Sequence, residues 1–182
     1  KDFKVSGYDG KYNAELFIFL NRDYPFFTSR GSVKNFNLKE FSKDLGGTYA
    51  LTGTASCEYE FDLNAYRPSQ MLEHSEALLN ISITSGSIKN TNIQKRLYKY
   101  FEQNGLHAND FTDLSFQNFS VTMTQRGGNF FISNFSLNSE PVNFNSYGLY
   151  NYSDGISVYI YPIITDRENK IINIPFRISG PL

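Results

Sequence analysis

The chain of 182 residues has no tryptophan and a single cysteine, Cys57. One cysteine cannot form an internal disulfide, so a disulfide framework is excluded, while the redox compartment stays open. A chain of this length buries roughly 70% of its unfolded surface, which is enough for one hydrophobic core without a disulfide or a metal ion. We therefore expect a single domain over residues 1–182.

Charge and long apolar runs are also scarce. The net charge is −1 and the sequence pI is about 6.2, so there is no basic surface for phosphates, and nucleic acid is not an expected partner. No run of about 18 apolar residues occurs, so no transmembrane helix is expected. Tyr, Phe, Asn and Ser are abundant, the chain starts at Lys1, and it lacks a signal-peptide core. This profile predicts a mature extracytoplasmic protein (periplasmic, cell-surface or secreted), with a lipid anchor at a trimmed N-terminus as one option.

Alternation of apolar and polar residues at every second position dominates the sequence. From Tyr49 to Leu63, the odd-numbered residues, Cys57 included, are apolar or small, and nearly all residues between them are polar. This period predicts a strand with one buried and one wet face. Because the segment exceeds the usual strand length of about 3 to 10 residues, we expect a bend or bulge near Gly53. The wet face carries an acidic row of Glu58, Glu60 and Asp62.

Six further segments have strand patterns: Ala14–Leu20, Leu78–Thr84, Ser115–Thr124, Phe130–Leu137, Ile156–Ile164 and Lys170–Ile178. The first is apolar on both faces, which predicts a central strand that is covered on both sides. Turn residues at Arg126–Asn129 and at Thr165–Lys170 predict two hairpins.

Two helices are expected. Asn37 has the pattern of an N-cap, with Glu40 three residues later and with Phe36 placed to pack on Phe41. A longer amphipathic helix is predicted at about 92–104, where apolar residues repeat every four positions. Together these elements predict a mainly β fold: a single-domain antiparallel β-sandwich or partly open barrel of about seven to nine strands, with the amphipathic helix packed against it.

Residues with catalytic or metal-binding chemistry give no convincing pattern. Cys57 lies on the apolar side of its strand, where a thiolate is disfavoured, so we expect a packed thiol that a reagent labels only after denaturation. His74 and His107 lack a second ligand at the spacing of a zinc site. The acidic row has the spacing of a glycosidase pair, but such rows usually provide solubility and protect a sheet edge. We therefore predict no catalytic residue, no metal and no cofactor, and a protein that is not an enzyme.

The segment Ser115–Asn138 has two interpretations. Its arms are rich in Ser and Thr and are long enough to cross a bilayer as tilted strands, as in a pore-forming toxin. The commoner interpretation is a half-buried hairpin of a soluble sheet. On the second arm we expect Phe131, Ser133, Phe135 and Leu137 to share one face.

The segment Asn143–Gly155 is the strongest candidate for a binding site. It consists almost entirely of Tyr, Asn, Ser and Gly, the mixture typical of recognition loops. We predict a loop in which Tyr147, Tyr150, Tyr152 and Asp154 bind a protein or glycan ligand. The function we expect is therefore a non-enzymatic extracytoplasmic binding or assembly module. The alternatives are a β-barrel carrier of an apolar small molecule, which would use inward Tyr and Phe side chains, and a pore-forming protein.

Overall fold

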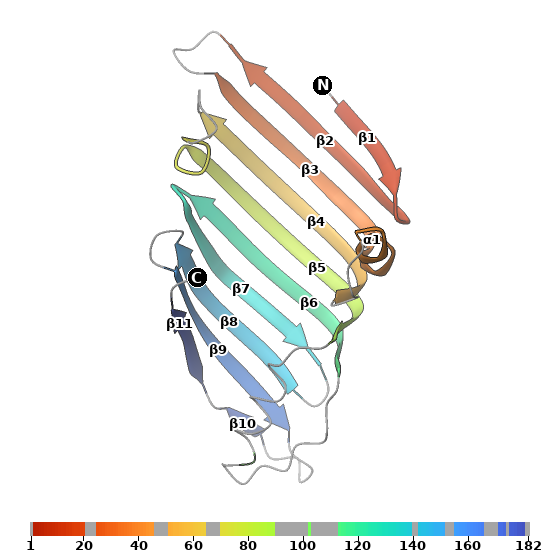
Figure 1. Cartoon of the computed structure of the whole chain (residues 1–182), viewed down its shortest axis with the longest axis vertical. Coiled ribbons are helices and arrows are strands. Elements are labelled where there is room, and N and C mark those ends of the chain that lie inside the picture. The colour runs from red at the N-terminus through yellow and green to blue at the C-terminus, as the bar shows by residue number, and fades with distance from the viewer. Residues whose placement is uncertain are drawn as a thin grey trace.

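The computed structural model describes residues 2–20, 25–45, 51–64, 70–89, 102, 113–139, 142–151, 155–165, 171–173 and 175–180. These residues form a sheet of eleven strands and the short helix α1, Leu38–Asp44 (Figure 1). The strands are β1 Asp2–Gly7, β2 Gly10–Phe19, β3 Phe26–Asn37, β4 Leu51–Asn64, β5 Ser75–Lys89, β6 Asp113–Arg126, β7 Asn129–Asn138, β8 Val142–Asn151, β9 Gly155–Thr165, β10 Ile171–Asn173 and β11 Phe176–Gly180.

The sheet is an antiparallel meander that follows chain order. Each strand from β1 to β9 pairs with the next one, and β9 also pairs with both β10 and β11. Within the described residues no pair joins β1 to the opposite edge, so the sheet is open and does not close into a barrel. The prediction of a mainly β, antiparallel and partly open fold is confirmed, although eleven strands exceed the predicted number.

Two strand predictions need correction. The segment Asn143–Gly155 is not a loop, because residues up to Asn151 belong to β8 and pair with both β7 and β9. The apolar segment at Ala14–Leu20 is not central, because it belongs to β2, which lies next to the edge strand β1. The apolar residues on both sides of β2 therefore do not mark a strand covered by two layers.

Bulges decide which face several residues occupy. The predicted bend near Gly53 is confirmed, because the register shifts between Thr52 and Thr54 and Gly53 has a φ of 125°. In β7 a second shift lies between Ile132 and Phe135. An extra residue at a bulge reverses the alternation of faces. The prediction that Phe131 and Phe135 share a face is therefore wrong: Phe135 pairs with Val121, whereas Phe131 pairs with Thr124 on the opposite face.

The short helix α1 starts as its sequence predicts. The side chain of Asn37 accepts a hydrogen bond from the backbone N–H of Glu40 at 3.2 Å. The rings of Phe36 and Phe41 contact each other with centroids 5.2 Å apart. The predicted helix at about 92–104 lies outside the described residues, apart from the helical residue Glu102.

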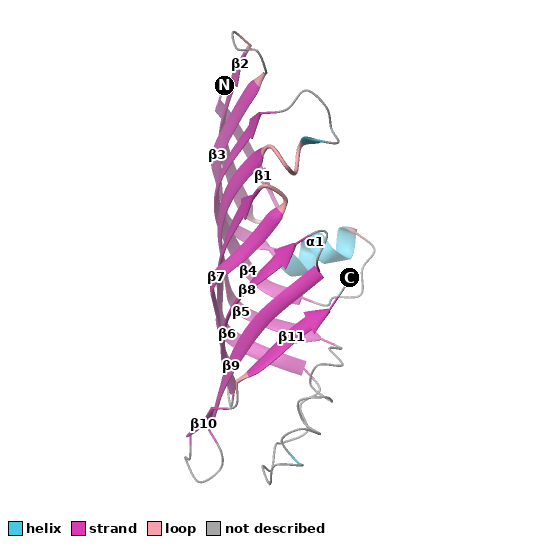
Figure 2. Ribbon diagram, turned by 90° about the vertical axis from the view of Figure 1, so that its left-hand side faces the viewer, coloured by secondary structure: helices cyan, strands magenta, loops and turns pink. Residues whose placement is uncertain are grey.

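Among the described residues, the core of the sheet is thin. Three buried side chains, Ile83, Phe116 and Leu137, form its central cluster, and Leu38 of α1 packs against them. Figure 2 shows the sheet edge-on as a single layer, with α1 on one side of it. In the described part of the chain, α1 therefore covers only one end of one face.

Candidate functional site

One face of the sheet is apolar from β1 to β11. Residues that pair directly across antiparallel strands lie on the same face, so the registers identify its members. The apolar face includes Phe3, Val5, Tyr12, Ala14, Leu16, Ile18, Phe27, Val33, Cys57, Tyr59, Phe61, Leu63, Leu79, Ile81, Ile83, Phe119, Val121, Met123, Phe130, Ile132, Phe135, Leu137, Phe144, Tyr150, Ile156, Val158, Ile160 and Ile178. The opposite, outer face carries the predicted acidic row of Glu58, Glu60 and Asp62, all exposed.

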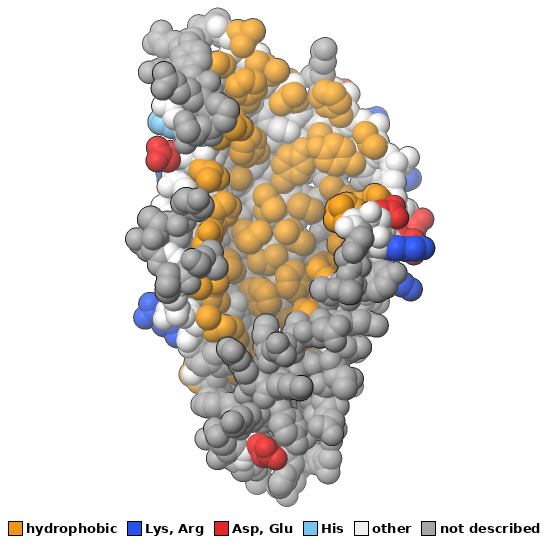
Figure 3. Space-filling model, viewed as in Figure 1, with side chains coloured by type: hydrophobic (Ala, Val, Ile, Leu, Met, Phe, Trp, Pro, Cys, Tyr) orange, Lys and Arg blue, Asp and Glu red, His pale blue; other side chains and the backbone are white. Residues whose placement is uncertain are grey.

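The apolar face is open to solvent mainly towards its edges. The chain exposes 12494 Å², whereas a compact monomer of its mass, 20.9 kDa, would expose about 9,000 Å². Exposure is greatest towards the two edges, where Phe3, Val5 and Ile18 lie at one side and Ile178 at the other. Figure 3 shows the apolar side chains gathered on this face, next to α1. A surface of this kind usually marks a site for a ligand or partner.

Two elements stand on the apolar side of the sheet at its opposite ends. At one end α1 joins a cluster of the Tyr8, Phe36 and Phe41 rings. At the other end the turn at Gln70–His74 is held down by its Leu72 carbonyl, which accepts hydrogen bonds from Gln125 Nε2 at 2.8 Å and from the Gly128 N–H at 2.9 Å. Figure 2 shows both elements on the same side of the sheet. The apolar face therefore has a raised border at each end.

A small hydroxyl cluster interrupts the apolar face near β2. The hydroxyls of Tyr12 and Tyr59 lie 2.7 Å apart, and Ser29 Oγ lies 3.2 Å from the Tyr59 hydroxyl. The Tyr59 ring lies over Gly31, where a Cβ atom would come within 2.6 Å of it. The hydrogen bond to Tyr59 is the main cause that raises the pKa of Tyr12 to about 12. A few fixed polar groups in an apolar surface are typical of sites that orient a small ligand.

Cys57 lies near the middle of the apolar face. It pairs with Val33 on one side and with Ile81 on the other, and its side chain is partly buried. Burial raises the pKa of its thiol, and the nearby charge of Glu58 adds to the shift. The predicted inward position is thus confirmed. Labelling only after denaturation is untested, and because the side chain is only partly buried we expect slow labelling of the folded protein instead.

The structure separates the residues of the predicted binding site. Tyr147 lies on the outer face and is 47% exposed. Tyr150 lies on the apolar face, where its ring centroid is 5.6 Å from that of Phe130. Tyr152 and Asp154 lie outside the described residues. The alternation along β8 explains the separation, and the binding role of these four residues stays a prediction.

On the outer face Tyr147 joins aromatic residues that the sequence reasoning missed. Its ring stacks on Tyr159 at 5.3 Å and on Tyr161 at 5.6 Å, and its hydroxyl lies 2.9 Å from that of Tyr161. The guanidinium of Arg177 lies 5.5 Å from the Tyr159 ring centre. The alternating pattern of β9 could have placed Tyr159 and Tyr161 on one face, but only the register brings Tyr147 beside them. Tyr147 and Tyr159 nevertheless remain exposed on the outer face.

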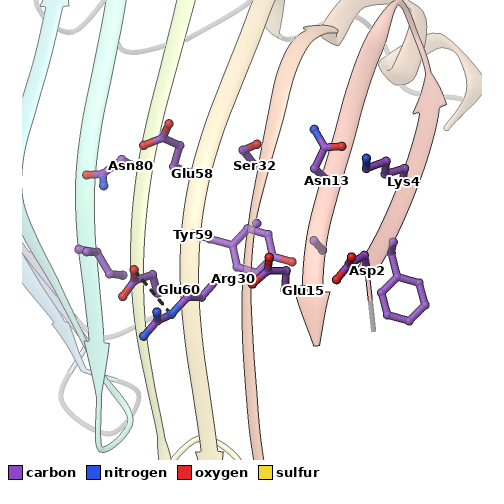
Figure 4. A pocket seen from close by; sticks show the side chains of 14 residues that line it. Asp2, Lys4, Asn13, Glu15, Arg30, Ser32, Glu58, Tyr59, Glu60 and Asn80 are labelled. Atoms are coloured by element: carbon purple, nitrogen blue, oxygen red, sulfur yellow. Dashed lines mark ion pairs between the residues drawn. The ribbon is translucent and has the colours of Figure 1, made fainter. Parts of the chain in front are cut away.

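The outer face also has a shallow polar groove of about 680 Å³ over β1 to β5. Figure 4 shows its side chains, with Glu58 and Glu60 on β4 facing Ser32 and Arg30 on β3. Arg30 Nε lies 3.8 Å from Glu60 Oε1, and both side chains are largely exposed. Carboxylates this well solvated are typical of a soluble surface, so the groove offers weaker evidence of a site than the apolar face does.

Comparisons with protein-family models, with curated proteins and with solved structures found no match for the chain. In the described part of the chain, no three or more His, Cys, Asp or Glu side chains are grouped so that they could hold a metal ion. None of the described helical residues belongs to a helix long and apolar enough to cross a membrane.

Proposed function

We propose that the protein is a non-enzymatic binding protein whose apolar face holds a mainly apolar molecule with one hydrogen-bonding group. The observation that carries this proposal is the apolar face, which continues across the described strands and is exposed towards its two edges. Burying such a surface is favourable by about 25 cal/mol per Å², so an apolar ligand gains free energy by covering it. Of the functions that the sequence suggests, the carrier of an apolar molecule fits this face best, with an open sheet in place of a closed barrel.

The borders of the apolar face favour a small ligand over a second copy of the chain. Two sheets that pack face to face lie about 10 Å apart, and a helix with its side chains is about 10 Å wide. A second sheet would therefore have to avoid α1 and the Gln70–His74 turn, which both stand on this side. A small molecule can lie between them without moving either.

The hydroxyl cluster indicates the second chemical feature of the ligand. The Tyr12, Ser29 and Tyr59 hydroxyls lie within one hydrogen-bonded group on the mainly apolar face. A hydroxyl or carboxyl group of the ligand can bond to them while its chain covers the neighbouring apolar residues. On composition alone, we also propose an extracytoplasmic location.

Two adjacent leucines of β5 provide a matched test. Leu79 lies on the apolar face between Tyr59 and Met123, whereas Leu78 lies on the outer face between Glu60 and Thr124. The probe is cis-parinaric acid, a fluorescent fatty acid, titrated into the delipidated protein. We expect saturable binding that Leu79→Gln weakens by about tenfold and that Leu78→Gln leaves unchanged. Absence of saturable binding, or an equal loss in both variants, would refute the proposal.

A second measurement separates a ligand from a second copy. Sedimentation velocity of the delipidated protein should give a monomer at all concentrations tested. A dimer that Leu79→Gln dissociates would mean that a second copy covers the apolar face, and this would overturn the ligand proposal. In the monomer, bound cis-parinaric acid should slow the labelling of Cys57, which lies between Val33 and Ile81.

A further inference from the structure

Four consecutive apolar residues are exposed at the end of β2 and at the position that follows it. Phe17, Ile18, Phe19 and Leu20 are 47%, 50%, 43% and 76% exposed. They lie where β2 approaches the β2–β3 connection, at the end of the sheet that Figure 1 draws at the top. This apolar tip, Phe17–Leu20, is the largest run of exposed apolar side chains among the described residues.

Both faces of β2 contribute to the apolar tip. Ile18 pairs with Phe27 and belongs to the apolar face, whereas Phe17 and Phe19 pair with Thr28 and Phe26 and point to the outer face. The rings of Phe19 and Phe26 contact each other at 5.9 Å on that side. A flat protein surface, including the face of a second copy, could cover only one side of the tip. A bilayer interface can cover both sides, because lipid surrounds whatever enters it.

The charges around the apolar tip indicate that burial of apolar surface, and not electrostatic attraction, would drive its binding to a bilayer. The outer-face positions of β3 and β4 next to the tip hold Thr28, Asp62 and Asn64, none of which is basic, and in the sequence just after the tip the charge of Arg22 is offset by that of Asp23. Attraction to anionic lipid is therefore not expected, whereas Phe and Leu side chains favour the interfacial region of any bilayer. The pairs Ile18–Phe27 and Phe27–Leu63 also connect the tip to the rest of the apolar face without a polar break.

We propose that the apolar tip inserts into the surface of a lipid bilayer and so docks the β2 edge of the apolar face on a membrane. The inference rests on the exposure of the tip on both sides of β2, and it does not depend on the proposed ligand. If both proposals hold, an apolar molecule can pass between the bilayer and the apolar face without crossing water.

The absence of tryptophan from the chain permits a direct test. Phe19→Trp places the only indole at the tip, and Phe131→Trp places it in the middle of the outer face, at a residue with the same exposure of 43%. With phosphatidylcholine vesicles, we expect a blue shift and quenching by brominated lipid for Phe19→Trp alone. An unchanged spectrum for Phe19→Trp, or equal changes in both variants, would overturn the proposal. So would a concentration-dependent blue shift without vesicles, which would indicate a second copy on the tip.

Vesicle sedimentation then measures the contribution of the tip. Replacing both Phe17 and Phe19 by Ser should lower the partition onto phosphatidylcholine vesicles by about tenfold or more, with little dependence on salt. The matched control replaces Phe131 and Leu149, exposed apolar residues of the outer face away from the tip, by Ser and should bind vesicles like the parent. Equal binding by the tip variant and the parent would overturn membrane docking.

Binding of cis-parinaric acid in the same variants distinguishes failure of the two proposals. Loss of vesicle binding with retained probe binding would leave the ligand proposal intact. Vesicle binding by a protein that does not bind the probe would support docking and refute only the ligand proposal.

Discussion

Two isoleucines of the apolar face test whether that face is open. Ile83 is 4% exposed in the central cluster beside Phe116 and Leu137, whereas Ile18 is 50% exposed at the end of β2. Removing a well-packed Ile to Ala costs about 2 to 5 kcal/mol, because apolar burial is lost and a cavity remains. At Ile18 about half of the side chain is already in water and no closed cavity forms, so Ile18→Ala should cost only about 1 kcal/mol.

Urea unfolding of the delipidated variants measures both costs under identical conditions. We expect the midpoint to fall more for Ile83→Ala than for Ile18→Ala, with an unchanged slope for both. In thermal unfolding, 1 kcal/mol corresponds to about 2–4 °C for a chain of this size, so Ile83→Ala should lower the Tm by about 4–20 °C. Equal costs at the two positions would show that the edge of the apolar face is as well covered as its centre. That result would refute the open-face reasoning.

Three further predictions concern individual positions. Tyr147→Ala should cost about 1–2 kcal/mol in urea unfolding, because it removes two ring stacks, whereas a cost within about 0.5 kcal/mol would mean that the stack adds no stability. Gly86→Ala should destabilise the protein by about 1–3 kcal/mol, because the added Cβ would clash with the Phe116 ring, while Gly7→Ala, with no neighbour within 4 Å, should be near neutral; similar costs for both would contradict this packing. Burial raises the pKa of the Cys57 thiol, so the rate of its alkylation by iodoacetamide should reach half of its maximum at a higher pH than for a free cysteine. A midpoint pH equal to or below that of free cysteine would mean that the thiol lies in water.

The sequence alone was sufficient for local structure. The period of two along Tyr49–Leu63 predicts both the strand β4 and the face that Cys57 occupies. The cap at Asn37 and the contact between Phe36 and Phe41 predict the start of α1. These features depend on residues within a few positions of one another, and their physical causes act within one turn or one strand.

Tertiary pairing decided the features that matter for binding. The apolar pattern of β2 predicts a covered central strand, yet its place beside the edge leaves Phe17 to Leu20 exposed. Likewise, the residues of Asn143–Gly155 read as one recognition loop, but pairing with β7 and β9 makes a strand whose alternation sends Tyr147 and Tyr150 to opposite faces.

The physical reason is the difference between local and long-range interactions. The alternation of a strand states which residues share a face, but it does not state which strands are neighbours, whether the sheet closes, or what covers a face. The bulge in β7 that moves Phe131 to the outer face and the stacking of Tyr147 on Tyr159 both follow from cross-strand register. Register is set by contacts between segments distant in the chain, so only the folded sheet determines the open apolar face and its exposed tip.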